Sequence, residues 1–119
     1  MGKVKIADEV VAVIAGLAAT EVSGVAAMSG GVVGGIAEKL GRKNLAKGVK
    51  VEVGERETAI DLYIIVEFGA RIPDVALRIQ EGVEKAVESL TGLKVVEVNI
   101  HVQGVHFKGE EQEEEQRVK

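Results

Sequence analysis

The clearest pattern of apolar and polar residues lies between Ile72 and Gly104, where a helical repeat changes to a strand repeat across one glycine. Apolar side chains first recur every three or four residues, which predicts an amphipathic helix that begins near Pro73 and ends at Gly92. They then alternate with polar side chains, which predicts a strand with one buried face. The apolar sets are Ile72, Val75, Ala76, Ile79, Val83, Ala86, Val87 and Leu90 in the helix, and Val96, Val98, Ile100 and Val102 in the strand.

An earlier helix is predicted from Glu9 to Val22, with Asp8 as its N-cap residue. Its apolar side chains lie on nearly every side, and a helix of that kind has to be covered on two faces. Either the later helix and the sheet cover it together, or a second subunit covers one face. Its apolar residues are Val10, Val11, Val13, Ile14, Leu17, Ala18 and Val22.

Two further alternating runs predict a β-hairpin. One runs from Val49 to Val53, the other runs from Ile60 to Phe68, and a turn containing Gly54 joins them. The second strand is apolar on both faces near its middle, so we expect it at the centre of the sheet. With a short strand at Val25–Met28, the chain predicts an α+β fold. This fold has a three- to four-stranded sheet with two main helices packed on one face, in the order helix, strand, loop, hairpin, helix, strand.

The domain organisation follows from where the apolar pattern stops. Residues 1–109 are expected to form a single α+β domain, and residues 110–119 a disordered Glu-rich tail, because glutamate runs without apolar residues stay solvated. Six glycines between Ser29 and Gly48 predict a mobile connection with a turn or two of helix within residues 32–40. Near the start, Lys3 to Ile6 alternates and would form either a short edge strand or an arm.

Composition narrows the classes of function. The 119 residues include no cysteine, which excludes disulfides, thiolate nucleophiles and thiolate metal sites. The longest stretch without a polar side chain, Val10–Ala19, has ten residues, about half of what a bilayer crossing requires. We therefore expect a soluble, cytoplasmic protein without a transmembrane segment. The tail carries −3 of the total charge of −4, so residues 1–109 are close to neutral and exert no general attraction on nucleic acid.

Two groups of polar residues are candidates for binding. The first is a basic stretch, which could bind phosphates, acidic lipid headgroups or an acidic partner, although a solvated loop is the simpler and preferred interpretation. This stretch contains no aromatic residue on which bases could stack. The second is the outward face of the predicted sheet, which either faces solvent or forms a flat surface for another protein. The candidate contact residues are Lys39, Arg42, Lys43, Lys47 and Lys50 in the stretch, and Tyr63, Glu67, Glu97, Asn99 and His101 on the sheet, where Glu52, Asp61, Ile65 and Gln103 accompany them.

Catalytic, cofactor and metal sites have little support in the sequence. Carboxylates near His101 would lie on an open sheet face, which supplies neither the burial nor the charged neighbours that tune an acid or a base. His101 and His106 lack a carboxylate motif that would complete a metal site. The glycines from Gly30 to Gly35 lack the Lys-Ser/Thr ending of a phosphate-binding loop. We therefore expect no enzyme activity, no cofactor and no metal.

The order and spacing of several short motifs resemble the alkaline shock protein family of mainly Gram-positive bacteria. The resemblance covers residues 3 to 107, nearly the whole chain. Each motif is modest, being glycine and alternating aliphatic residues, so their order and spacing carry the specificity. The motifs are Lys43-Asn44, Lys47-Gly48-Val49-Lys50-Val51-Glu52-Val53, Ile60-Asp61-Leu62, Val66-Glu67-Phe68-Gly69, Ile72-Pro73 with Gln80 and Val83, Thr91-Gly92-Leu93, and Val96-Glu97-Val98-Asn99-Ile100-His101-Val102.

This resemblance implies a cytoplasmic protein linked to stress and to cell-envelope homeostasis, without known catalysis. Members of the family can be held at the membrane by a small anchor protein and can self-assemble, so the implied partners are other proteins and further copies of the chain. No catalytic residues come with the family. We therefore expect a non-enzymatic interaction or scaffold domain. The alternative is a module that binds nucleic acid or an anionic surface through the stretch Lys39–Lys50.

Overall fold

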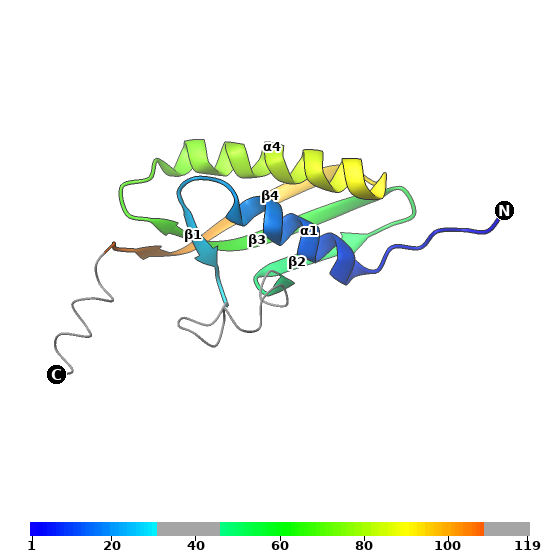
Figure 1. The fold of residues 1–119 in the computed structure, drawn as a ribbon, viewed down its shortest axis with the longest axis horizontal. Coiled ribbons are helices and arrows are strands. Elements are labelled where there is room, and N and C mark those ends of the chain that lie inside the picture. The colour runs from blue at the N-terminus through cyan, green and yellow to red at the C-terminus, as the bar shows by residue number, and fades with distance from the viewer. Residues whose placement is uncertain (31–45, 109–119) are drawn as a thin grey trace.

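A computed structural model describes residues 1–30 and 46–108. Within these ranges, two helices and four strands follow one another in the predicted order, which confirms the α+β fold (Figure 1). The predictions of a mobile glycine-rich connection, of a helical piece within it and of a disordered tail concern residues that lie wholly or mostly outside the described ranges. The elements are α1 (Asp8–Thr20), β1 (Val25–Met28), β2 (Val49–Val53), β3 (Glu57–Glu67), α4 (Ile72–Thr91) and β4 (Lys94–His106).

Strand β3 is the centre of the sheet. Strand β4 runs parallel to it along one edge, from the pair Glu57 and Lys94 to the pair Glu67 and His106. The connection between these two parallel strands is α4, as parallel pairing requires a crossover rather than a tight turn. Strands β1 and β2 both run antiparallel to β3. The expectation that the second hairpin strand is central is therefore confirmed.

Strands β1 and β2 share the second edge of β3 end to end. The Ser29 N–H donates to the Tyr63 carbonyl, and the Tyr63 N–H donates to the Gly48 carbonyl, both at 2.7 Å. The chain thus leaves the edge after β1 and returns to the same point at Gly48. Gly48 has a φ of +79°, and a Cβ there would collide with the carbonyl oxygens of Ser29 and Tyr63. Only glycine fits this junction.

Both helices cover one face of the sheet and contact each other (Figure 1). Helix α1 lies over β1 and β2, while α4 lies over β4. The even-numbered side chains of β3 point towards the helices and are buried. The core is aliphatic and comprises Val11, Ala15, Ala19, Met28, Ile60, Leu62, Ile64, Val66, Val75, Ile79, Val83, Val87, Leu93 and Val95.

Helix α1 is covered within its own chain on the side that carries Val11, Ala15 and Ala19. The opposite side keeps Val10 and Leu17 exposed. Of the two predicted ways of covering this helix, coverage by the later helix and the sheet therefore accounts for its buried side. The N-cap prediction was wrong: Ala7 is the N-cap and Asp8 is already helical, without a capping hydrogen bond from its side chain. An acidic residue in the first turn still stabilises the helix through its dipole.

Helix α4 confirms the predicted start and stop. Pro73 lies in the first turn, and Gly92 ends the helix in the left-handed conformation with a φ of +78°. The Gly92 N–H donates to the Glu88 carbonyl. The four buried residues of the predicted stripe are Val75, Ile79, Val83 and Val87, whereas Ile72 and Leu90 at the two ends are exposed.

Strand β4 departs from the predicted alternation at two β-bulges. The first inserts Val96, so Val95 is 6% exposed while Val96 is 51% exposed. The prediction that Val96 belongs to the core was therefore wrong. The second bulge inserts Gln103. It returns His106 to the same face as His101, because an inserted residue resets which side chains face outward.

Replacing Ile79 by alanine should lower the free energy of unfolding by about 2–5 kcal/mol, since the side chain is fully buried between the helices and the sheet. Leu77→Ala, on the exposed side of the same helix, should change it by less than about 0.5 kcal/mol. Urea unfolding of both variants measures the difference. Similar losses would contradict this placement of α4.

Two glycine substitutions should have opposite signs. Gly48→Ala should destabilise the fold by at least about 1–2 kcal/mol, because its backbone is left-handed and the added Cβ meets two carbonyl oxygens. Gly82→Ala, inside α4 with open space around the added Cβ, should stabilise it by about 0.5–1 kcal/mol. Thermal or urea unfolding of the pair checks both signs. A neutral Gly48→Ala would refute the junction of β1 and β2 described above.

Candidate functional site

The face of the sheet opposite the helices carries most of the candidate residues that the structure describes. We call it the outer face. The cross-strand pairs place Lys50, Asp61 and Asn99 side by side, with Tyr63 beside His101 in the next row. Its side chains come from alternate positions of β2, β3 and β4. The outer face comprises Lys50, Glu52, Glu57, Ala59, Asp61, Tyr63, Ile65, Glu67, Glu97, Asn99, His101 and His106.

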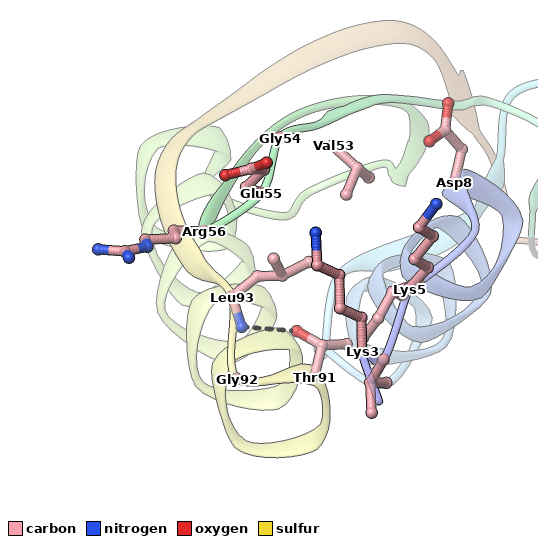
Figure 2. A pocket seen from close by; sticks show the side chains of 12 residues that line it. Lys3, Lys5, Asp8, Val53, Gly54, Glu55, Arg56, Thr91, Gly92 and Leu93 are labelled. Atoms are coloured by element: carbon pink, nitrogen blue, oxygen red, sulfur yellow. Dashed lines mark hydrogen bonds between the residues drawn. The ribbon is translucent and has the colours of Figure 1, made fainter. Parts of the chain in front are cut away.

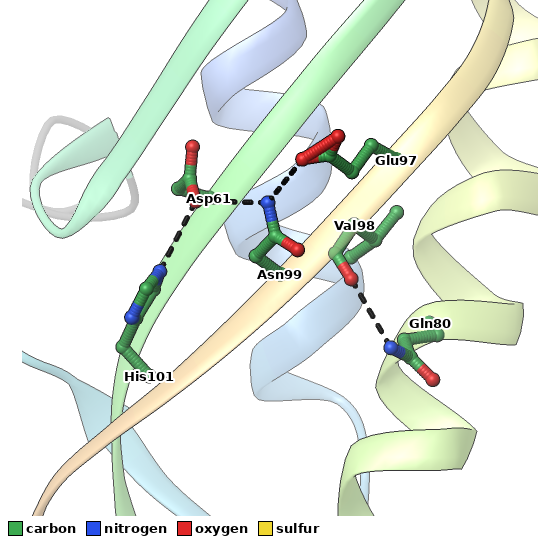
Figure 3. Close-up of polar contacts among 6 residues, drawn as sticks. All are labelled: Asp61, Gln80, Glu97, Val98, Asn99 and His101. Atoms are coloured by element: carbon green, nitrogen blue, oxygen red, sulfur yellow. Dashed lines mark hydrogen bonds and ion pairs between the residues drawn. The ribbon is translucent and has the colours of Figure 1, made fainter.

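Asp61 is the centre of the polar contacts on the outer face. One of its oxygens, Oδ1, accepts a hydrogen bond from Asn99 Nδ2 and lies 3.1 Å from His101 Nε2 (Figure 3). Asn99 Nδ2 also donates to Glu97 Oε2 at 2.7 Å. Four side chains from two neighbouring strands thus form one network. The Asn99 amide group donates to both carboxylates and so links Asp61 to Glu97.

Tyr63 lies between His101 and Lys50. Its ring stacks on the His101 imidazole with centroids 4.3 Å apart and an interplanar angle of 11°. The Lys50 ammonium lies 5.5 Å from the Tyr63 ring centroid, within the range of a cation–π contact. Both ring neighbours come from the strands that flank β3. The stack therefore holds three side chains in fixed positions on an otherwise open surface.

The surroundings of Asp61 lower the pKa of its carboxyl group below the ordinary value. The hydrogen bond with His101 is the largest cause, and the bond from Asn99 and the positive charges of His101 and Lys50 act in the same direction. Partial burial opposes them. Asp61 is therefore ionised over the whole physiological range of pH.

A second pair of histidine and carboxylate lies two rows further along the same face. His106 Nδ1 lies 3.4 Å from the Glu67 carboxylate. Just beyond this pair, Phe68 stacks on Phe107 with centroids 4.5 Å apart. The second bulge in β4 brings the two histidines to one face. Uninterrupted alternation from His101 to His106 would have placed the two side chains on opposite faces, and the bulge at Gln103 prevents this.

The structure brings together only part of the predicted contact set. Lys50, Tyr63, Asn99, His101 and Glu97 lie in adjacent rows, and Glu67 lies further along. Lys47 is exposed beside the junction at Gly48. Lys39, Arg42 and Lys43 lie outside the described residues. Sequence reasoning put Asp61 on this face but missed its central role, although its spacing of two from Tyr63 is a usable signal.

A groove that the sequence did not suggest lies at the end of the sheet where β2 turns into β3, opposite the end that carries His106 and Phe107. It has a volume of about 990 Å³ and is bordered by the N-terminal arm, the turn between β2 and β3, and the end of α4 (Figure 2). Lys3, Lys5 and Arg56 border it, together with Asp8 and Glu55. The C-terminal end of α4 adds partial negative charge. Because both signs of charge are present, the groove has no clear preference for an anion or a cation.

The geometry of the outer face suits binding better than catalysis. The His101 and Asp61 side chains are 40% and 37% exposed, so solvent reaches both. A general acid or base gains its catalytic tuning from a desolvated or strongly charged site. Across residues 1–30 and 46–108, no three histidine, aspartate or glutamate side chains are grouped closely enough to hold a metal ion.

Comparison with known proteins gives the family. Residues 1–107 match the model of the alkaline shock protein 23 family, which is described as having a "cell envelope-related function". The chain belongs to this family. The resemblance to alkaline shock proteins is thus confirmed. Membership connects the chain with the cell envelope, and the names of relatives add the stress response. No solved structure matches the chain.

Several relatives of this alkaline shock protein family member are known by name. It is 45% identical to the Bacillus subtilis protein YqhY over 113 residues, which cover 95% of this chain and 84% of that protein. It is 39% identical to Bacillus subtilis YloU over 87% of this chain and 88% of that protein. It is 36% identical to a Streptococcus pyogenes "stress response regulator gls24 homolog" over 98% of this chain and 65% of that protein. No helix in the described part of the chain is long and apolar enough to span a membrane.

Removing the His101 imidazole should raise the pKa of Asp61 towards its ordinary value, because the largest cause of the lowering is lost. A carboxyl-carbon NMR titration of the wild type and of His101→Ala measures this directly. Equal Asp61 pKa values in the two proteins would contradict the network.

The same shift makes stability depend on pH. Because the pKa of Asp61 is lower in the folded state, ionised Asp61 stabilises the fold above its unfolded pKa of about 3.9. This contribution disappears as the pH falls through the folded-state pKa. The stability advantage of the wild type over Asp61→Asn should therefore shrink between about pH 5 and pH 2. A constant difference over that range would refute the assignment.

Proposed function

We propose that this alkaline shock protein family member is a non-enzymatic interaction domain that docks a partner protein on its outer face, in cell-envelope homeostasis or the stress response. The observation that carries the proposal is a sheet face that neither described helix covers, on which the Tyr63 ring stacks on His101 and lies beneath the Lys50 ammonium. The descriptions of its family and relatives support the biological setting, since they refer to the cell envelope and to stress regulation.

The outer face has the composition of a contact surface. Tyr63 offers an amphipathic ring, Ile65 lies in the next row of β3, and Ala59 lies two rows away on the other side. Charged and amide side chains from β2 and β4 flank these positions. Interfaces commonly combine an aromatic centre with a polar rim. The side chains here are already positioned by one another, so little conformational entropy is lost when a partner binds.

The rest of the proposal concerns the organisation of the chain. Residues 1–109 act as the single interaction domain, and the Glu-rich residues 110–119 keep the protein soluble. The domain works in the cytoplasm and reaches the membrane through its partner, for which a small anchor protein is the simplest candidate. Nothing in this arrangement requires a cofactor.

The alternative function, binding of nucleic acid or another anionic surface by the stretch Lys39–Lys50, has weaker support. Only Lys47 and Lys50 of the five cations lie among the described residues. Lys50 is placed over the Tyr63 ring and opposite Asp61. The carboxylates of Glu52, Asp61 and Glu97 lie on the same face, and they would repel a phosphate backbone.

Photo-crosslinking in the native host tests the proposed docking face. Tyr63 is replaced by a benzophenone-bearing phenylalanine, which keeps the aromatic ring, and Glu84 on the exposed side of α4 is replaced in the same way as a control. We expect a discrete adduct from position 63 that is absent from position 84, with the partner identified by mass spectrometry. Equal adducts at both positions, or none at position 63, would contradict the proposal.

A further inference from the structure

The outer face has a row of uncharged residues across its middle. Ala27, Ile65 and Gly104 are paired with one another across three strands. We call these three residues the Ile65 row. A Cβ placed on Gly104 would have only the Ile65 side chain within 4 Å, at 3.9 Å, apart from its chain neighbours. The sheet is therefore open to an incoming side chain at this point.

The rows on either side of the Ile65 row carry histidine rings. On one side, His101 stacks on Tyr63 with the ring centroids 4.3 Å apart. On the other side, His106 Nδ1 lies 3.4 Å from the Glu67 carboxylate. Both histidines are thus held by a side chain of β3. An apolar side chain that rested on the Ile65 row would lie between bulkier side chains in defined positions, as an anchor residue does in an interface.

Carboxylates outnumber cations on the outer face. Within the described strands, five acidic side chains face outwards together with two lysines, so the formal charge is −3 when the histidines are neutral. The pKa of Asp61 is lowered by its contacts with His101 and Asn99, so this carboxyl group carries its full charge. The acidic residues are Glu52, Glu57, Asp61, Glu67 and Glu97, and the lysines are Lys50 and Lys94.

The positions of the carboxylates determine which kind of cation fits. All except Glu67 lie on the same side of the Ile65 row, and Asp61 and Glu97 are linked through Asn99 (Figure 3). Asp61 and Glu57 are four residues apart on β3, a distance of about 13 Å at about 3.3 Å per residue. In residues 1–30 and 46–108, no acidic or histidine side chains group closely enough to hold a metal ion. A segment with several basic side chains matches charges spread in this way better than a single ion does.

Like charge disfavours other occupants of the outer face. A second copy of the chain would bring the same negative face against this one. The Glu-rich residues 110–119 have a net charge of −3, and phosphate groups are negative as well. Charges of equal sign repel one another most strongly where a contact excludes water. The occupant that remains is a positively charged one.

We propose that the outer face binds a basic segment of another protein. One apolar side chain of that segment rests on the Ile65 row, and its lysine or arginine side chains pair with the carboxylates of Glu52, Asp61 and Glu97. This inference rests on the proposed function and adds the chemistry of the partner. Because Ile65 and Asp61 are four residues apart, the basic side chains begin about 13 Å from the apolar one, at about 3.3 Å per residue. Complementary charge of this kind speeds association and selects the partner.

Selection of short random peptides displayed on phage, with the full chain as the target, tests the chemistry of the partner. We expect the enriched peptides to carry a net positive charge and at least one large apolar residue. Their affinity, measured by fluorescence anisotropy, should fall as salt is added, because salt screens exposed charges. Enrichment of neutral or acidic peptides, or no enrichment, overturns the inference.

Two double variants with the same change in total charge locate the binding. Glu52→Lys with Glu97→Lys places cations on the outer face and should weaken binding of the selected peptides by about tenfold or more, equivalent to about 1.4 kcal/mol. Glu81→Lys with Glu84→Lys, on the exposed side of α4, is the matched control and should bind as the wild type does. Circular dichroism confirms that both are folded. Equal losses in the two variants overturn the inference.

Gly104→Val tests the place of the apolar side chain. The fold should be at least as stable as the wild type in urea unfolding, because glycine within a strand weakens it and the site has room for a Cβ. Peptide binding should nevertheless fall by about tenfold, equivalent to about 1.4 kcal/mol, because the new side chain occupies the Ile65 row. A residue with a structural role alone would not show opposite effects on stability and binding. Unchanged binding contradicts the proposed placement.

The cross-link at position 63 separates this inference from the proposed function. A partner adduct that persists in Glu52→Lys with Glu97→Lys, and whose linked segment is not basic, leaves the docking face intact and refutes only the basic chemistry. If no adduct forms while basic peptides bind the wild type and not this variant, the surface chemistry stands and docking in the host is refuted. An adduct that contains only copies of this chain contradicts both.

Discussion

The rest of the structure depends on the pairing of β3 along both of its edges. This strand bonds to β4 over its full length on one side and to β1 and β2 on the other. Its even-numbered side chains form the floor of the core beneath both helices. Because a strand alternates its side chains, burial of that set forces Asp61, Tyr63, Ile65 and Glu67 to the opposite face. The candidate site is thus a direct consequence of how the core is built.

The distribution of side-chain types makes the two faces chemically different. The buried face is made mainly of valine, isoleucine, leucine and alanine. The aromatic residues of the chain, Tyr63, Phe68 and Phe107, all retain exposure. Aromatic side chains contribute most to stability when their large apolar area is buried, but in this protein they lie at the surface. This placement adds little to the stability of the fold, whereas exposed aromatic residues are common in binding surfaces.

Helix α4 has two roles that are separate in space. Its buried stripe closes the core, while Gln80 and Glu88 bond to the backbone of β4 from the side. The buried stripe begins at Val75 and the first of these bonds comes from Gln80, so neither role extends before the start of the helix at Ile72. The length of one helix therefore decides how much of β4 is covered and how much is left for contact.

Local residue patterns determined the elements of this protein, and only the tertiary structure decided which side chains meet. Helix ends at Pro73 and Gly92 and the alternation in β3 were readable because they depend on neighbouring residues alone. The bulges at Val96 and Gln103, the junction at Gly48 and the network around Asp61 were not. Each depends on which strand lies alongside, and strand register is a long-range property that no local repeat encodes.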